Sequence, residues 1–225
     1  MSKRLTKEQL HDDEFVSALY AIIRYAEDNY PKVLAGIGMV VVISMIGYFI
    51  QESANRRIAA ANDAIGTVQV ALMQGNTSTA ITTAQSVIRD YEGEPVAGQA
   101  LTTLANIYFD QGRFDEATTH YRQFLSTNDA NFGPEEFGAW SGIASSLEAQ
   151  GNLSGAAQQY LSYADRFSNT AYAPLALFQA ARTYKLAGST DSAVNAYQRI
   201  VSQYSDSPAA ISAKTELGIL GVVVD

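Results

Sequence analysis

Hydrophobic residues follow two different patterns along the chain, and the first is an unbroken run. Val33 to Ile50 are eighteen consecutive residues without a charge. As a helix this run is about 27 Å long, close to the roughly 30 Å thickness of a bilayer's hydrocarbon core. It is apolar on every side, whereas a helix that covers a soluble core keeps one polar face. The pattern therefore predicts a membrane-spanning helix rather than a buried core helix.

The flanking sequence favours a permanent anchor over a cleaved export signal. Thirty-two residues, several of them acidic, precede the run, and Glu52 stands where a cleavage site needs a small residue. Two basic residues lie near each end, but the N-terminal tail adds three more, and long domains cross a membrane largely regardless of their charge. We expect residues 1–31 to form a cytoplasmic tail or helix, 32–52 the transmembrane anchor, and 53–225 a domain outside the cytoplasm.

Beyond residue 58 the second pattern begins, a repeat of small residues, glycine and tyrosine. The stretch LANIYFDQGRFDEATTHY places Ala105, Gly112, Ala117 and Tyr121 at spacings of 7, 5 and 4. The same spacings recur in IASSLEAQGNLSGAAQQY and AARTYKLAGSTDSAVNAY, and an eroded copy around Gly75 lacks the aromatic residue. The four glycines are 37, 39 and 37 residues apart, which defines four repeat units.

Each unit is expected to be two helices joined at its glycine, because glycine adopts the left-handed conformation that ends a helix. Small residues on both sides of the turn let the two helices approach closely, and the tyrosine fills the gap to the next unit. One pair cannot bury its own apolar face, but stacked pairs can. We therefore predict an all-α fold: an N-terminal helix, a single transmembrane helix, then an α-solenoid of about four helix pairs with a closing helix from Ser207 to about Leu220.

This repeat, over roughly residues 58–219, resembles the tetratricopeptide repeat, including Trp140 at the family's aromatic start in the third unit. The full layout is a short charged helix, one anchor and degenerate repeats without a lipid-attachment cysteine. It resembles the YfgM family of bacterial inner-membrane proteins, which are ancillary subunits of the SecYEG translocon. The resemblance implies an inner-membrane location with periplasmic repeats. It also implies protein partners, either a membrane complex or exported proteins.

Charge is divided unequally between the two parts of the chain. Residues 1–57 contain seven basic and seven acidic residues, whereas residues 58–225 contain eight and sixteen, so the net charge of −8 lies in the repeats. An acidic domain repels a phosphate backbone, and we expect no nucleic-acid partner. The chain has no cysteine, which excludes disulfides and thiolate metal sites.

Residues typical of catalysis or of cofactor binding are sparse. His11 and His120 each lack a second ligand at metal-binding spacing, and the chain contains no phosphate loop, dinucleotide fingerprint or serine nucleophile elbow. The acidic run TNDANFGPEE does not place glycine and oxygen ligands at calcium-loop positions. We expect a binding module without cofactor or metal, not an enzyme.

By the family resemblance, the first helices of the units line a concave groove that holds a partner segment. The inward-facing residues would be Gln99, Thr102, Asn106 and Phe109 in the second unit, Ser141, Ser145 and Glu148 in the third, and Leu175, Phe178, Arg182 and Lys185 in the fourth. Family members that grip a C-terminal carboxylate use several lysines, asparagines and arginines here. We match Asn106 and Arg182 to that chemistry, which argues against carboxylate-tail capture.

Three functions stay open at this point. The chain is a scaffold for protein–protein interaction in protein export or envelope assembly, a structural accessory subunit of a larger membrane-protein complex, or, least in keeping with its residues, an enzyme. The apolar C-terminal tail LGILGVVVD also leaves two alternatives. It packs on the last repeat near Tyr197 and Ile200, or it inserts into a partner, because terminal residues are usually polar unless something holds them.

Overall fold

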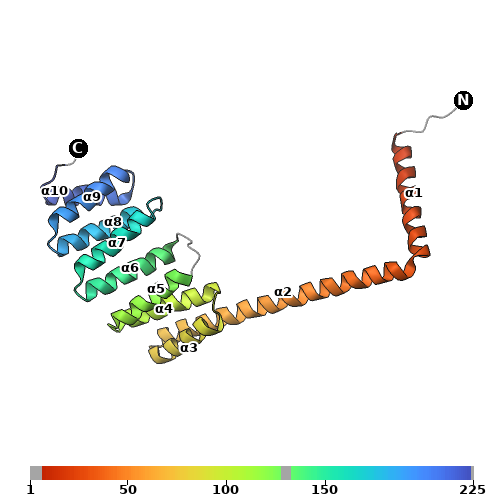
Figure 1. Ribbon diagram of the computed structural model, residues 1–225, viewed down its shortest axis with the longest axis horizontal. Coiled ribbons are helices and arrows are strands. Elements are labelled where there is room, and N and C mark those ends of the chain that lie inside the picture. The colour runs from red at the N-terminus through yellow and green to blue at the C-terminus, as the bar shows by residue number, and fades with distance from the viewer. Residues whose placement is uncertain (1–6, 128–132, 224–225) are drawn as a thin grey trace. The chain divides into compact units, whose positions relative to one another are not determined.

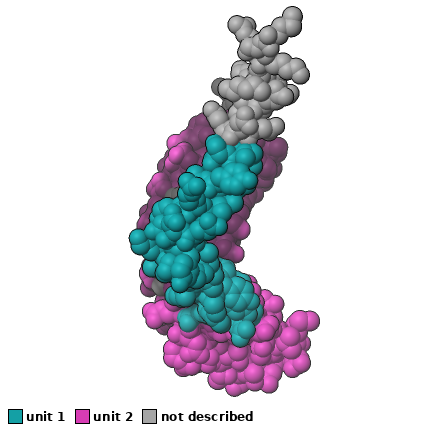
Figure 2. All heavy atoms as spheres, turned by 90° about the vertical axis from the view of Figure 1, so that its right-hand side faces the viewer, with its two compact units in different colours: residues 1–59 teal, residues 60–225 magenta. Residues whose placement is uncertain are grey.

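The computed structural model describes residues 7–127 and 133–223, and within these ranges it contains ten helices and no strand (Figure 1). The expected all-α fold, with about four helix pairs and a closing helix, is confirmed. The chain divides into two compact units, residues 1–59 and 60–225 (Figure 2). The helices are α1 (Lys7–Asp28), α2 (Tyr30–Met73), α3 (Thr77–Asp90), α4 (Pro95–Asp110), α5 (Phe114–Thr127), α6 (Pro134–Ala149), α7 (Leu153–Arg166), α8 (Ala173–Leu186), α9 (Thr190–Gln203) and α10 (Pro208–Ile219).

The first unit, residues 1–59, holds α1 and the N-terminal part of α2. Pro31 accounts for the break between the two helices, because it has no N–H to continue the helical hydrogen bonds. Asn29, the one residue between them, donates from its side-chain nitrogen to the carbonyl of Tyr25 at 3.1 Å. Every side chain from Leu34 to Ile50 is exposed. Among the described residues, α2 is the one helix long and apolar enough to cross a membrane.

The second unit, residues 60–225, is a stack of helix pairs (Figure 1). The C-terminal part of α2 pairs with α3, and α4 with α5, α6 with α7 and α8 with α9 follow, before α10 closes the stack. Its core is built from alanines and a few large side chains. One cluster extends from Ala61 to Ile143, and another from Tyr163 to Leu217. Small residues let the helices approach closely, as the repeat pattern predicts.

Each helix pair turns at its predicted glycine. Gly112 has a φ of 73°, in the left-handed region that favours glycine, and the equivalent glycines 75, 151 and 188 have φ of 73°, 81° and 74°. The next residue then caps the helix, as where the Arg113 N–H donates to the Tyr108 carbonyl at 2.8 Å. The same turn ends α10, at Gly221 with a φ of 77°.

The tyrosine of a unit packs against the first helix of the next unit. Tyr121 of α5 is buried, and its hydroxyl donates to the side-chain oxygen of Asn106 on α4. Its ring lies so close to Gly142 of α6 that an added Cβ there would be 2.8 Å from the ring's Cε1 atom. Glycine at position 142 therefore makes room for the ring, and the predicted gap-filling role of the tyrosine is confirmed.

The C-terminal tail is divided between packed and exposed residues. Val222 is partly buried against the cluster that contains Tyr197 and Ile200, whereas Val223 is 90% exposed. The last two residues of the tail lie outside the described part of the chain. Val222 therefore packs on the last repeat, as the first alternative predicts, whereas Val223 does not.

Candidate partner-binding groove

The predicted groove residues all lie on the first helices of the repeat pairs, namely α4, α6 and α8. Successive first helices are neighbours in the stack, since α4 contacts α6 and α8 contacts α10. Their side chains can therefore form one continuous surface. Apart from the two serines of α6, the residues divide into three groups, which differ in what they contact.

The first group, on α4, is partly used for packing. Asn106 is occupied by the Tyr121 hydroxyl, and the Phe109 ring lies edge-on to Phe114 at 5.4 Å. Gln99 and Thr102 instead line a cavity of about 730 Å³ at the N-terminal end of α4. Gln99 and Asn106 are exposed and Thr102 is half-buried, so all three keep surface that a partner could contact.

The second group is a polar network between α6 and α8. Nη2 of Arg182 donates to both carboxylate oxygens of Glu148, at 2.7 and 2.9 Å, and the Thr183 hydroxyl donates to Glu148 at 2.7 Å. Nε of Arg182 donates to Gln179 at 2.9 Å. Because the charge of the guanidinium is already balanced by a carboxylate, a partner's terminal carboxylate would have to compete with Glu148 for it. The geometry supports the argument against carboxylate-tail capture.

A second ion pair repeats this arrangement one helix further along. Nζ of Lys185 lies 2.6 Å from a carboxylate oxygen of Glu216 on α10. Glu216 and Thr183 are not among the residues that the sequence predicts for this surface. These pairs join residues 34 and 31 positions apart, on the first helices of adjacent units, and the spacing within one unit does not specify such contacts.

The two serines of the α6 set are directed into the stack. The Ser145 hydroxyl lies 3.4 Å from the Tyr160 hydroxyl of α7. The Ser141 hydroxyl is buried and has no hydrogen-bond partner among the described residues. Neither serine hydroxyl therefore points to the surface where a partner would bind.

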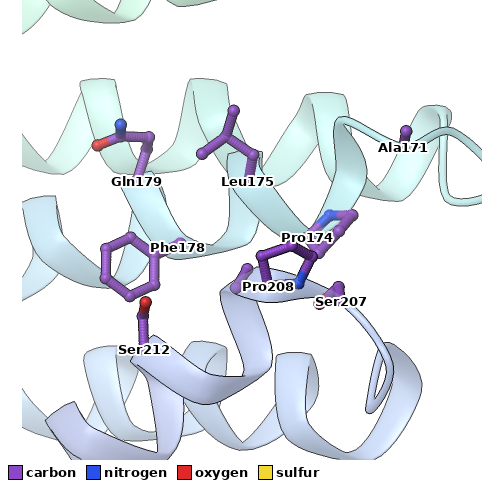
Figure 3. A pocket seen from close by; sticks show the side chains of 9 residues that line it. Ala171, Pro174, Leu175, Phe178, Gln179, Ser207, Pro208 and Ser212 are labelled. Atoms are coloured by element: carbon purple, nitrogen blue, oxygen red, sulfur yellow. The ribbon is translucent and has the colours of Figure 1, made fainter.

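The third group is apolar. Leu175 and Phe178 line a cavity of about 460 Å³ between α8 and α10, together with Ala171, Pro174, Gln179, Ser207, Pro208, Ala209 and Ser212 (Figure 3). Phe178 lies edge-on to Tyr197 at 5.4 Å, which holds its ring in place. Pro174 and Pro208 start their helices and have no N–H to offer, so the cavity presents mainly carbon to its occupant.

Tyrosines next to these surfaces are held in the neutral form. Burial, reinforced by the charge of Glu216, raises the pKa of Tyr197 to about 12. Burial, reinforced by Asp110, raises the pKa of Tyr121 to about 12. Both hydroxyls therefore keep their protons throughout the physiological range. Among residues 7–127 and 133–223, no three His, Asp or Glu side chains gather as a metal site would require.

Comparisons with known proteins agree with this architecture. Two family models described as Tetratricopeptide repeat match the chain, one at residues 65–125 and 102–174 and the other at residues 175–207. A crystal structure of a tetratricopeptide repeat protein from Parabacteroides merdae ATCC 43184 superposes with a TM-score of 0.54 at 19% identity. That match covers 69% of this chain and 57% of the other, so the chain matches little more than half of that protein's length.

No curated protein matches the chain. The fold evidence thus rests on the repeat models and on the structural likeness, and it extends over most of the second unit. Proteins of this family act generally as non-catalytic scaffolds that bind other proteins. The chain belongs to the tetratricopeptide-repeat family.

Proposed function

We propose that this chain is a membrane-anchored scaffold for protein–protein interaction in protein export or envelope assembly. The observation that carries the proposal is the composition of α2. Its residues from Leu34 to Ile50 are uncharged, mostly apolar and exposed, and the same helix supplies the first buried residues of the repeat unit from Ala61 onward. Exposed apolar length sufficient for a bilayer, joined to a tetratricopeptide unit, is the layout of a single-pass membrane scaffold.

The location follows from the anchor. We place Val33–Ile50 in the inner membrane, residues 1–31 in the cytoplasm, and the repeats in the periplasm. The larger number of basic residues in the N-terminal tail and the resemblance to the YfgM family of translocon-associated proteins support this arrangement. In spheroplasts, external protease should digest the repeats and leave the N-terminal tail protected. Digestion of the tail alone would reverse the orientation.

Membrane attachment itself has a separate test. The uncharged run of eighteen residues should hold the full-length protein in membranes through high-salt and alkaline washes, because salt screens surface charge but does not weaken burial in lipid. Recovery of intact protein in the wash would contradict the anchor.

The partner segment is recognised, on this proposal, through apolar side chains in the cavity between α8 and α10. The ion pair of Arg182 with Glu148 leaves the neighbouring surface close to neutral, whereas the cavity beside it is lined with carbon. Apolar side chains of an extended peptide gain most from such a site, because burying apolar surface contributes about 25 cal/mol per Å². Exported proteins that are not yet folded expose segments of this kind.

Photo-crosslinking in cells tests the groove directly. A photoreactive amino acid at Leu175 or Ser212 faces the cavity, and one at Gln198 on α9 provides an exposed control on a second helix of the stack. We expect partner adducts at the first two positions and few at Gln198. Phe178→Ala should reduce the adducts at Leu175 several-fold without unfolding the unit. Equal yields at all three positions would contradict groove binding.

The runner-up function is a structural accessory subunit that uses its anchor as a lateral contact. Replacing Val33–Ile50 by an unrelated transmembrane helix separates the two proposals. A scaffold keeps its partners after the exchange, whereas a subunit bound through its anchor loses the complex. The Leu175 adducts should persist in the first case only.

A further inference from the structure

The helix α1 carries an apolar side that no described residue covers. Phe15 is 67% exposed and Ile22 is 66% exposed, and Val16, Leu19 and Ile23 are exposed as well. Large apolar side chains gathered on one helix are costly in water, because each loses the free energy of burial. Their arrangement therefore points to a partner surface.

The apolar residues of α1 form a single continuous face. At about 100° per residue, Phe15, Val16, Ala18, Leu19, Ile22, Ile23 and Ala26 fall within an arc of roughly 160°. Tyr20 and Tyr25 lie at the two borders of that arc, and Ala21, Arg24 and Asp28 lie opposite it. Tyrosine at the border between an apolar and a polar face is typical of a helix lying in a membrane interface.

The connection to α2 determines where this face is. Only Asn29 separates the end of α1 from the start of α2, and the uncharged run begins at Val33. If α2 spans the bilayer, α1 must start at the bilayer surface, since four residues cannot carry it far away. Pro31 interrupts the helical hydrogen bonds at this point and allows α1 to leave the axis of α2.

We propose that α1 lies along the membrane surface at the N-terminal end of the anchor, with its apolar face in the lipid interface. This inference rests on the proposed membrane anchor. The helix then fixes the depth of the anchor, with Tyr20, Tyr25 and Tyr30 at the level of the lipid headgroups.

Charge identifies the kind of surface. The sequence of α1 contains two basic and six acidic residues. Such a helix is not drawn to anionic lipid, and two copies of it repel each other. The apolar face is therefore buried in lipid that carries no net charge, such as zwitterionic phospholipid. Anionic lipid and a second copy of this chain are disfavoured by the acidic residues of the helix.

The absence of cysteine makes a labelling test straightforward. Full-length protein in nanodiscs of zwitterionic phospholipid, one chain per disc, carries a single environment-sensitive fluorophore. Leu19→Cys and Ile23→Cys report the apolar face, Ala21→Cys and Arg24→Cys the polar face, and Val41→Cys the centre of the anchor. We expect iodide to quench the label several-fold less at positions 19 and 23 than at 21 and 24. Adding anionic lipid should not strengthen that protection.

The outcomes separate the two proposals. An iodide-accessible label at Val41 overturns the anchor and this inference with it. Protection at Val41, with equal quenching at all four α1 positions, overturns this inference and leaves the anchor standing. Protection of Leu19 and Ile23 that appears only when a disc holds two chains assigns the face to a second copy and also overturns it.

Discussion

A single methyl group at Gly142 of α6 should disturb the stacking of neighbouring repeats. The buried ring of Tyr121 lies over this glycine, and the Tyr121 hydroxyl is bonded to Asn106 on α4. A Cβ at position 142 would be 2.8 Å from Cε1 of the ring and nearer still to Cε2 and Cζ. Non-bonded carbon atoms prefer about 3.5–4.0 Å. The ring must therefore move, and its hydrogen bond resists the movement.

Two opposing effects decide the size of the change. Overpacking a filled core costs about 1–3 kcal/mol, and loss of the Tyr121 hydrogen bond adds about 1 kcal/mol. Alanine in place of a helical glycine returns up to about 1 kcal/mol. We expect Gly142→Ala to lower the free energy of unfolding by about 1–3 kcal/mol. Gly138, on the same helix, has nothing within 4 Å of an added Cβ. Gly138→Ala should therefore raise the free energy of unfolding slightly.

Urea unfolding of a fragment from Arg56 onward, followed by helical circular dichroism, measures both variants. Midpoints convert to free-energy differences when the slopes agree. In a Tyr121→Leu background the ring is gone, and most of the Gly142→Ala penalty should disappear with it. Two alanine variants of equal stability, or a penalty that survives the loss of the ring, would refute the proposed contact between ring and helix.

Other predictions concern turns, ion pairs and pH. Gly112→Val should destabilise the fragment by at least about 1–2 kcal/mol. Gly133→Val should cost less, because φ is 73° at Gly112 but −96° at Gly133. Equal losses of stability would contradict the assigned turn. Glu148→Gln should lower the free energy of unfolding by about 1–2 kcal/mol, since it weakens the charge-assisted hydrogen bonds from Arg182 and Thr183. Glu116→Gln, which removes an exposed ion pair, should change stability little. The pKa of Tyr121 and of Tyr197 is raised to about 12 in the fold, above about 10 for an unfolded tyrosine. Their contribution is therefore complete below pH 10 and lost as the pH rises toward 12, because the unfolded chain gives up its protons first. A urea midpoint that stays constant from pH 9 to 12 would exclude this.

The repeat architecture could be predicted from the sequence because its signals are local. A glycine at a left-handed turn and small residues on either side specify the conformation of a few neighbouring residues, and the structure shows them at Gly112 and its equivalents. The chemistry of the groove could not be predicted in the same way. Arg182 looks like a free cation in the sequence, but its charge is satisfied by Glu148, on the first helix of the preceding unit. That pairing depends on how adjacent units register, which the spacing within one unit does not specify.

Helix α10 carries the same local signals, a proline at its start and a glycine after its end, as the first helices of the repeat units. Pro208 follows Pro174 by 34 residues and Gly221 follows Gly188 by 33, so α10 has the start and the end of a first helix. Its Leu217 is buried in the core, whereas Ile211 and Ile219 are 73% and 69% exposed, and no second helix follows within the described residues. The helix therefore has two roles besides ending the stack. It completes the apolar cavity beside Phe178 through Pro208 and Ala209, and it keeps Lys185 paired through Glu216. Removing α10 would therefore abolish the cavity and leave Lys185 without its ion pair to Glu216.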